Sequence, residues 1–171
     1  LQVDPDNSAL TSQNIGNYPD LFYIKLDENG NYMWSNSIKT NYEITPNKIR
    51  INENDEVHIV GIFSGNIDFD PSININVIES SNCTFGDAFI FKASNSGDFI
   101  YAKHIYNPDG YSTKIKDLDF SQENDVFCVG SFAGPNCDFN PGSDIVSFDS
   151  YSFDLFMLQL ENSGDFKWVG R

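Results

Sequence analysis

The sequence contains little of what helices, disulfide frameworks or polyanion-binding surfaces require. Among 171 residues there are 13 Ala and Leu together, 3 Cys, and 10 Lys and Arg against 25 Asp and Glu. No apolar run approaches the roughly 18 residues of a membrane-spanning helix. The formal net charge of -15 repels nucleic acid and anionic lipid, so we expect no nucleic-acid partner and no direct membrane insertion.

The three cysteines exclude a disulfide framework, and their spacing matches no zinc-binding pattern. Cys128 lies in the apolar run Val126–Val129 and is best interpreted as a small buried hydrophobic residue. Cys83 and Cys137 lie in loop-like sequence. A disulfide between them is open to an exported chain, and the sequence leaves that pairing undecided.

The residues that are abundant favour strands and turns. Ile, Val, Phe, Tyr and Trp together number 50, and these β-branched and aromatic side chains fit the pleated surface of a sheet. There are also 20 Asn, and 18 of the 25 acidic residues are Asp, which turns use preferentially. The composition therefore predicts an all-β protein with many tight turns.

An internal repeat runs through the chain. The segment that begins at Asp20 recurs from Asp87 and again from Asp154, each time 67 residues further on. The same step relates the turn glycines and the aromatic residues that follow them, which are Gly30, Gly97 and Gly164, and Trp34, Tyr101 and Trp168. Self-similarity at such a period is the signature of a repeat architecture, in which each unit packs on its neighbours.

Each repeat divides into four short strands separated by hairpin-length turns. We expect strands near 48–52, 57–63, 88–93 and 99–105 in one repeat, and near 117–121, 126–132, 155–160 and 166–169 in the next. Four antiparallel strands per repeat at this period describe a β-propeller blade. Gly61 and Gly130 fall at the same place in their strands, where we expect sheets to crowd.

The predicted organisation is about two and a half blades. Residues 1–39 are the second half of a blade, residues 47–105 are a complete blade with a long insertion at 64–86, and residues 114–171 are a complete blade with a long insertion at 133–153. Propellers close with about four to eight blades. We therefore expect a fragment of a longer propeller or a ring completed by other copies, because an open arc exposes apolar blade faces.

Several phrases of the sequence resemble SBBP-type β-propeller repeats. They are Asp27–Trp34, Gly61–Gly65, Asp68–Pro71 and Gly86–Phe89, and the resemblance extends in register over nearly the whole chain. It implies an exported repeat protein of Bacteroidota or related bacteria, from a family defined by architecture rather than by activity. We therefore expect an extracellular or cell-surface location; no signal peptide is present in this stretch.

Four residues are candidate metal ligands: Asp68, Asp70, Asp138 and Asn140. In each pair, oxygen-bearing side chains two residues apart on an extended segment point to the same side, and the Phe between them points into the core. Such oxygens suit Ca²⁺, which we expect as the cofactor at these positions. The alternative is that the four side chains cap turns by accepting backbone N–H groups. The sequence has no complete D-x-D-x-D-G loop.

Long connections lie at one end of the predicted blades, at 64–86 and 133–153, with shorter ones at 39–46 and 106–114. Long loops on a rigid scaffold commonly carry binding sites, so we expect a protein or glycan partner at this face. An alternative that the sequence leaves equally open is that the two insertions only add an outer hairpin to each blade.

The leading functional prediction is a non-enzymatic repeat module of a secreted or surface-attached bacterial protein, which acts as a scaffold, adhesion module or ligand-binding platform. One alternative is part of a propeller enzyme of the lyase, hydrolase or quinoprotein type, with its active site on the propeller axis. Another is a propeller fragment bound within an export or motility assembly.

No nucleophile elbow, zincin helix, P-loop or Rossmann fingerprint occurs, and we predict no catalytic residue. Asp20, Asp87 and Asp154 are expected to fix turns.

Overall fold

The computed structural model describes residues 18–81 and 86–171, and the regular elements in these ranges are all β-strands. The strands are β1 (Leu21–Leu26), β2 (Tyr32–Ile38), β3 (Ile44–Ile51), β4 (Val57–Phe63), β5 (Asn66–Asp68), β6 (Val77–Glu79), β7 (Asp87–Ala93), β8 (Phe99–Ile105), β9 (Thr113–Phe120), β10 (Val126–Asp138), β11 (Ser147–Leu160) and β12 (Phe166–Gly170). Their pairings are antiparallel. The predicted all-β class is confirmed.

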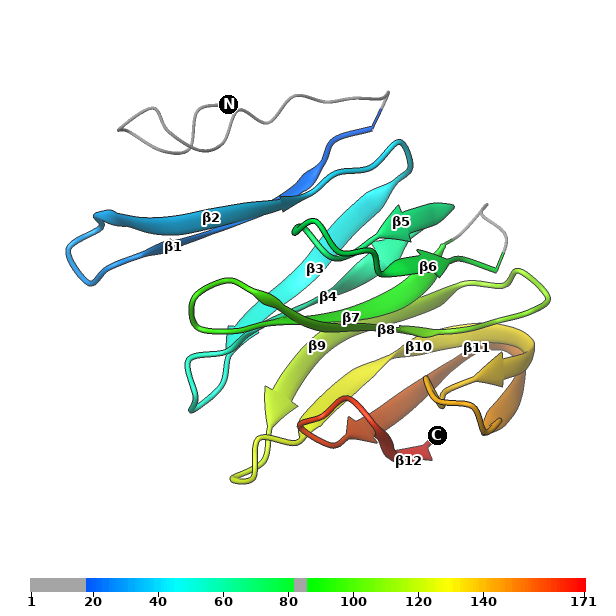
Figure 1. Cartoon of the computed structure of the whole chain (residues 1–171). Helices are drawn as coiled ribbons and strands as arrows, with labels where there is room; N and C mark the ends of the chain where they lie inside the picture. The colour runs from blue at the N-terminus through cyan, green and yellow to red at the C-terminus, as the bar shows by residue number, and fades with distance from the viewer. Residues whose placement is uncertain (1–17, 82–85) are drawn as a thin grey trace.

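These strands form two four-stranded sheets, in the orders β3-β4-β7-β8 and β9-β10-β11-β12, and two hairpins, β1-β2 and β5-β6. We call the β1-β2 hairpin the first unit, the β3-β4-β7-β8 sheet with its β5-β6 hairpin the second unit, and the β9-β10-β11-β12 sheet the third unit. Figure 1 shows the three units stacked in chain order, with β1-β2 and β9–β12 at opposite ends.

The four-stranded antiparallel sheets that the repeat predicts are confirmed. The assembly of such sheets into a propeller stays a prediction, as do the unit boundaries at 1–39, 47–105 and 114–171. Part of the first predicted unit and part of the 64–86 insertion, including Cys83, lie outside the described residues. Within the described ranges, no helix is present that could cross a bilayer.

The units pack face to face through two apolar clusters. We call the side of a unit that lies against the next unit its front face, and the side that lies against the preceding unit its back face. One cluster joins the front face of the first unit to the back face of the second, and includes Leu21, Tyr23, Ile38, Ile59, Phe89, Phe91 and Ala93. The other joins the front face of the second unit to the back face of the third, and includes Val60, Ala88, Ile90, Leu118, Cys128, Leu158 and Leu160.

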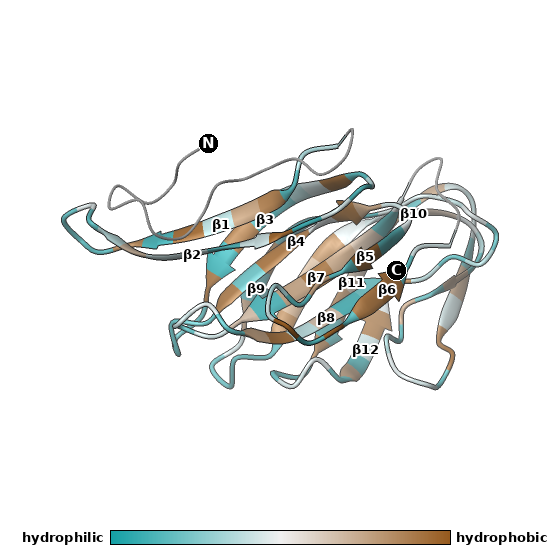
Figure 2. Cartoon of the chain, turned by 45° about the horizontal axis from the view of Figure 1, so that its top comes forward, coloured by the Kyte–Doolittle hydropathy of each residue, from teal (hydrophilic) through white to brown (hydrophobic). Residues whose placement is uncertain are grey.

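Strand β7 shows how the sequence produces this stacking. Its seven residues, Asp87–Ala93, are all buried. Because successive side chains of a strand point to opposite faces, Ala88 and Ile90 reach the front face while Phe89 and Phe91 reach the back face. Burying each large apolar side chain contributes about 1.5–3 kcal/mol. Figure 2 shows the same pattern, with apolar residues along the central strands and polar residues at the hairpin turns.

Two glycines allow strands to approach closely where β3 and β9 are irregular. The register of β3 against β4 shifts between Pro46 and Lys48, and β9 against β10 shifts at Gly130. A side chain on Gly61 would meet the Thr45 carbonyl oxygen on β3. A side chain on Gly130 would meet the Lys114 carbonyl oxygen on β9. The crowding at both glycines comes from the backbone and a Phe ring of neighbouring strands in the same sheet, so the expectation that separate sheets crowd at these positions is wrong. Because such a bulge interrupts the two-residue alternation, the expected strands 48–52 and 117–121 begin too late.

A buried lysine ties the second unit to the third. Lys92 on β7 is almost fully buried, and its Nζ lies 2.8 Å from Glu56 Oε2 within its own unit. The same Nζ donates to Asn162 in the β11–β12 turn of the third unit, with distances of 3.1 Å to the carbonyl oxygen and 2.6 Å to Oδ1. These acceptors compensate a cation that burial alone would destabilise. Lys25 makes the equivalent contact, to the Asn95 carbonyl oxygen.

We expect Lys92→Met to lower the free energy of unfolding by about 2 kcal/mol, because Glu56 loses its partner and the Asn162 turn loses its donor. Urea-induced unfolding measures this. The matched control is Arg50→Met, which removes a half-exposed ion pair with Asp117 between the same two units. An exposed pair contributes about 0–1 kcal/mol, so equal losses in the two variants would contradict the role of Lys92.

The same pair predicts a dependence on pH. Burial raises the pKa of Glu56, but hydrogen bonds from Lys92 and Asn52 outweigh it and hold that pKa below its usual range. Because the folded pKa is the lower one, the stabilisation is present at neutral pH and is lost as pH falls through the folded value. We expect the stability difference between wild type and Lys92→Met to shrink between about pH 7 and about pH 3. A difference that stays constant over this range would show that the ion pair does not cause it.

Candidate functional site

The first pair of candidate metal ligands lies in a turn that its own side chains organise. Asp68 Oδ1 accepts hydrogen bonds from the backbone N–H groups of Asp70, at 3.2 Å, and Asn76, at 2.8 Å. Asp70 Oδ1 accepts one from the N–H of Ser72 at 2.9 Å. Phe69, between them, is completely buried and packs edge-on against Phe63, as the alternation of the strand predicts.

The second pair repeats this arrangement in the third unit. Asp138 Oδ1 accepts from the N–H groups of Asn140 and Val146, both at 3.0 Å, and Asn140 Oδ1 accepts from Gly142 N–H at 2.8 Å. Phe139 is buried like Phe69. In both turns the side chains act as caps for backbone donors, which is the alternative that the sequence left open. Across residues 18–81 and 86–171 no group of three or more His, Cys, Asp or Glu side chains would hold a metal ion. Calcium binding by these four residues stays a prediction.

Both long insertions form hairpins. In the second unit the insertion contains β5 and β6, which pair through Asn66–Glu79, Ile67–Ile78 and Asp68–Val77. In the third unit β10 and β11 themselves continue into the insertion, with register shifts at Gly134. The outer hairpin expected as one alternative is therefore present in the second and third units. Whether this end of the two units also binds a partner depends on the surface beside the hairpins.

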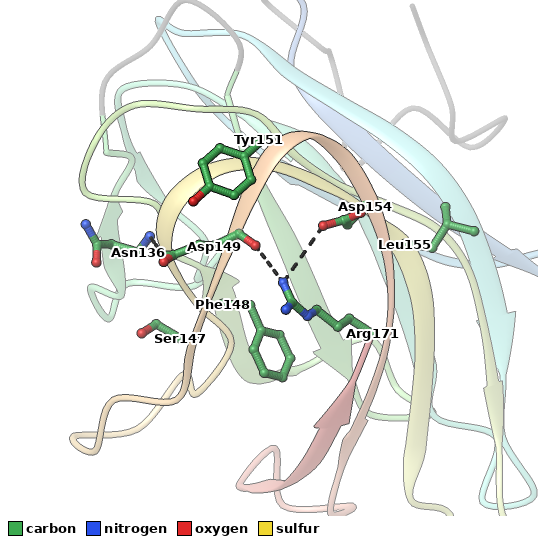
Figure 3. A pocket seen from close by; sticks show the side chains of 8 residues that line it. All are labelled: Asn136, Ser147, Phe148, Asp149, Tyr151, Asp154, Leu155 and Arg171. Carbon is green, nitrogen blue, oxygen red and sulfur yellow. Dashed lines mark hydrogen bonds and ion pairs between the residues drawn. The ribbon is translucent and has the colours of Figure 1, made fainter.

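A hollow of about 950 Å³ lies beside the hairpin of the third unit (Figure 3). Its lining combines acidic, amide, aromatic and basic side chains, from Asn136, Ser147, Phe148, Asp149, Tyr151, Asp154, Leu155 and Arg171. The Tyr151 ring is fully exposed. Figure 3 shows the Arg171 guanidinium between Asp149 and Asp154, with the Phe148 ring below it.

Short contacts fix the position of the guanidinium. Arg171 Nη1 donates to the Asp149 carbonyl oxygen at 2.7 Å and lies 3.9 Å from Asp154 Oδ2. Its guanidinium carbon stands 5.4 Å from the centre of the Phe148 ring, within the range of a cation–π contact. Asp149 Oδ1 also accepts a hydrogen bond from Asn136 N–H at 2.9 Å. The hollow thus holds one cation, two carboxylates and two aromatic rings in a defined arrangement.

An equivalent hollow of about 710 Å³ lies beside the hairpin of the second unit. The registers of the two hairpins make Glu79 the equivalent of Asp149. The 67-residue repeat makes His104 the equivalent of Arg171. Burial lowers the pKa of His104, which favours the neutral imidazole, whereas Arg171 is always charged. Tyr106, which directly follows β8, and Pro141, which lies in the insertion of the third unit, also line this hollow. The site therefore recurs from unit to unit with its chemistry varied.

Other residues that the sequence singled out, two aspartates and two cysteines, have structural roles. Asp87 accepts hydrogen bonds from Ser81 N–H and Oγ at 2.6 and 2.8 Å, and Asp20 accepts one from Thr40 N–H at 3.0 Å, so both fix loops. Cys128 is buried, as predicted, and burial raises its pKa to about 12, which makes it unreactive. Cys137 is also buried, with a free thiol, and lies in β10 rather than in a loop.

The sequence pattern does not single out Asp149, Tyr151 or Arg171. These positions hold Glu79, Ser81 and His104 in the preceding unit, so the repeat did not mark them as recurring residues. The signal that could have found them was their location, because Asp149 and Tyr151 lie in the long insertion and Arg171 follows it.

No protein-family model and no curated protein matches this chain. The likeness to SBBP-type repeats therefore stays a prediction.

We expect Asp138→Ala to lower the free energy of unfolding by about 1–2 kcal/mol, because two backbone donors lose their acceptor. Asp138→Asn keeps an acceptor oxygen and should retain most of the stability. Asp144→Ala, at an exposed position in the same turn, is the control and should change stability by less than about 0.5 kcal/mol. Thermal or urea unfolding distinguishes these outcomes, and an Asp138→Ala variant as stable as wild type would rule out the capping role.

Calcium binding has a separate test. If Asp68, Asp70, Asp138 and Asn140 hold Ca²⁺, the melting temperature rises in calcium relative to EGTA, because a ligand that binds the folded state stabilises it. Magnesium at equal concentration controls for ionic strength. An identical melting temperature in calcium and EGTA would contradict the prediction and leave turn capping as the role of all four side chains.

Proposed function

We propose that the chain is a non-enzymatic β-propeller repeat module of a secreted or cell-surface bacterial protein, and that it acts as a scaffold carrying a ligand-binding face. The observation that carries the proposal is the hollow beside the insertion hairpin, which recurs at equivalent positions in the second and third units. Each hollow stands on a sheet whose strands are packed on a neighbouring unit, and a rigid scaffold of this kind supports binding by its loops.

The lining of the third unit's hollow favours a hydroxyl-rich glycan as the ligand. The carboxylates of Asp149 and Asp154 accept hydrogen bonds from hydroxyl groups, and Arg171 donates them. The exposed ring of Tyr151 offers an apolar surface with a polar end, which suits the C–H face of a sugar ring. The strong negative charge of the chain favours neutral or amino sugars over acidic ones.

A glycan array probed with the labelled chain, followed by calorimetric titration of the best ligand, tests this proposal. We expect binding of neutral or amino sugars, and we expect Tyr151→Ala to weaken it at least about tenfold, because the stacking surface is lost. Tyr18→Ala is the matched control, since Tyr18 is an exposed tyrosine ahead of β1, at the opposite end of the stack. It should leave the affinity unchanged.

The same experiment separates the proposal from its alternatives. The bound glycan, recovered after prolonged incubation, should be unaltered, because the module is proposed to bind without catalysis. Cleavage or elimination products would favour the propeller-enzyme alternative. An array without any bound glycan, or binding that Tyr151→Ala does not change, would contradict a glycan site in this hollow.

A further inference from the structure

The front face of the third unit lacks the layer that covers the same face in the second unit. Ala88 and Ile90 on β7 are at most 1% exposed, because the third unit lies on them. The equivalent residues of β11, 67 positions later, are Leu155 and Met157, which are 77% and 44% exposed. Together with Val129, Trp168 and their neighbours they line an apolar hollow of about 620 Å³.

The back face of the first unit is uncovered in the complementary way. On β7 the back-face residues Phe89 and Phe91 are completely buried against the first unit. Their equivalents on β1 are Phe22 and Ile24, which are 44% and 37% exposed. Figure 1 places β1 and β11 in the units at opposite ends of the stack. The third unit therefore has an exposed apolar front face, and the first unit has an exposed apolar back face.

Polar contacts between units show what an occupant of the front face has to supply. Trp34 Nε1 of the first unit donates to the Asn95 carbonyl oxygen of the next unit at 2.9 Å, and Asn36 Nδ2 donates to the Gly97 carbonyl oxygen at 2.8 Å. Gly97 fits because a side chain there would meet the Trp34 ring at 2.9 Å. The aromatic residue of one unit thus receives the glycine-containing turn of the following unit.

The two ends of the chain carry the unmatched halves of this contact. Trp168 is the aromatic residue of the third unit; it is 39% exposed, and its Nε1 donates to Gln159 within its own unit. Gly30 is the turn glycine of the first unit, and no atom of another described residue comes within 4 Å of the place its Cβ would take. A Cβ on Gly164, by contrast, would lie 3.0 Å from the Tyr101 ring.

We propose that this chain self-associates head to tail: the front face of the third unit, centred on Leu155, Met157 and Trp168, binds the back face of the first unit and the Asp27–Gly30 turn of a second copy. The occupant is a second copy because this chain already displays both complementary surfaces, apolar side chains on each and the aromatic residue opposite the turn. Such a contact is heterologous, so it produces a ring or an open series rather than a closed two-fold dimer. The net charge of -15 on each copy opposes the association.

Sedimentation of the 171-residue chain over a range of concentrations tests this surface. We expect species heavier than one 19.3 kDa chain, and we expect them to increase with ionic strength between about 0.05 and about 0.5 M salt, because screening reduces the repulsion between copies. Met157→Asp alters the front face without touching the hollow proposed to bind glycan, and Ile24→Asp alters only the back face, so each variant alone should lose the heavier species.

Mixing the two variants gives the decisive result. The intact front face of Ile24→Asp can bind the intact back face of Met157→Asp, so the mixture should contain a dimer and nothing larger. Ile73→Asp, at a fully exposed position in the second unit's insertion, is the control and should associate like wild type. Circular dichroism establishes that each variant remains folded. A wild-type chain that stays monomeric, a single variant that still associates, or a mixture without dimer would each overturn the proposal, whatever the array shows about glycans.

Discussion

Each four-stranded sheet of this protein is apolar on both faces, and such a sheet is stable only when a layer covers each side. On β7 the side chains alternate between Ala88 and Ile90 on one face and Phe89 and Phe91 on the other, and all four are buried because units lie on both sides. The stacking of the units and the exposed apolar surfaces at the two ends of the stack both follow from this requirement.

Polar groups fix the spacing and orientation that apolar contact leaves free. The β7–β8 turn docks on Trp34 of the first unit, and the β11–β12 turn accepts two hydrogen bonds from Lys92 of the second. Within the turns, carboxylates take up backbone donors: Asp27 Oδ1 accepts from Asn29 and Asn31 N–H. Much of the acidity of the chain is therefore the consequence of hairpin turns that need a side-chain acceptor. The same acidity weakens association between copies.

Much of the fold was predictable, because alternation and turn chemistry are local. The burial of Phe69 and strand β4 (Val57–Phe63) both correspond to what the residues predict. The candidate site was predictable only as a region. Tyr151 and Arg171 are 20 positions apart in the sequence and hold different residue types in the preceding unit, so no local pattern connects them. Their juxtaposition depends on where β11 and β12 run beside the insertion hairpin.

The sequence by itself determined the class of the protein, its repeat and the positions of its turns, because strand alternation and Asp-, Asn- and Gly-containing turns depend on neighbouring residues alone. The tertiary structure decided which apolar face is covered and which is open. Met157 and Ile90 are both apolar residues at the same position of the repeat; Ile90 is buried because the third unit packs on it, whereas Met157 is exposed because no described residue covers it. That difference arises from contacts between units, which the local pattern of a single strand does not encode.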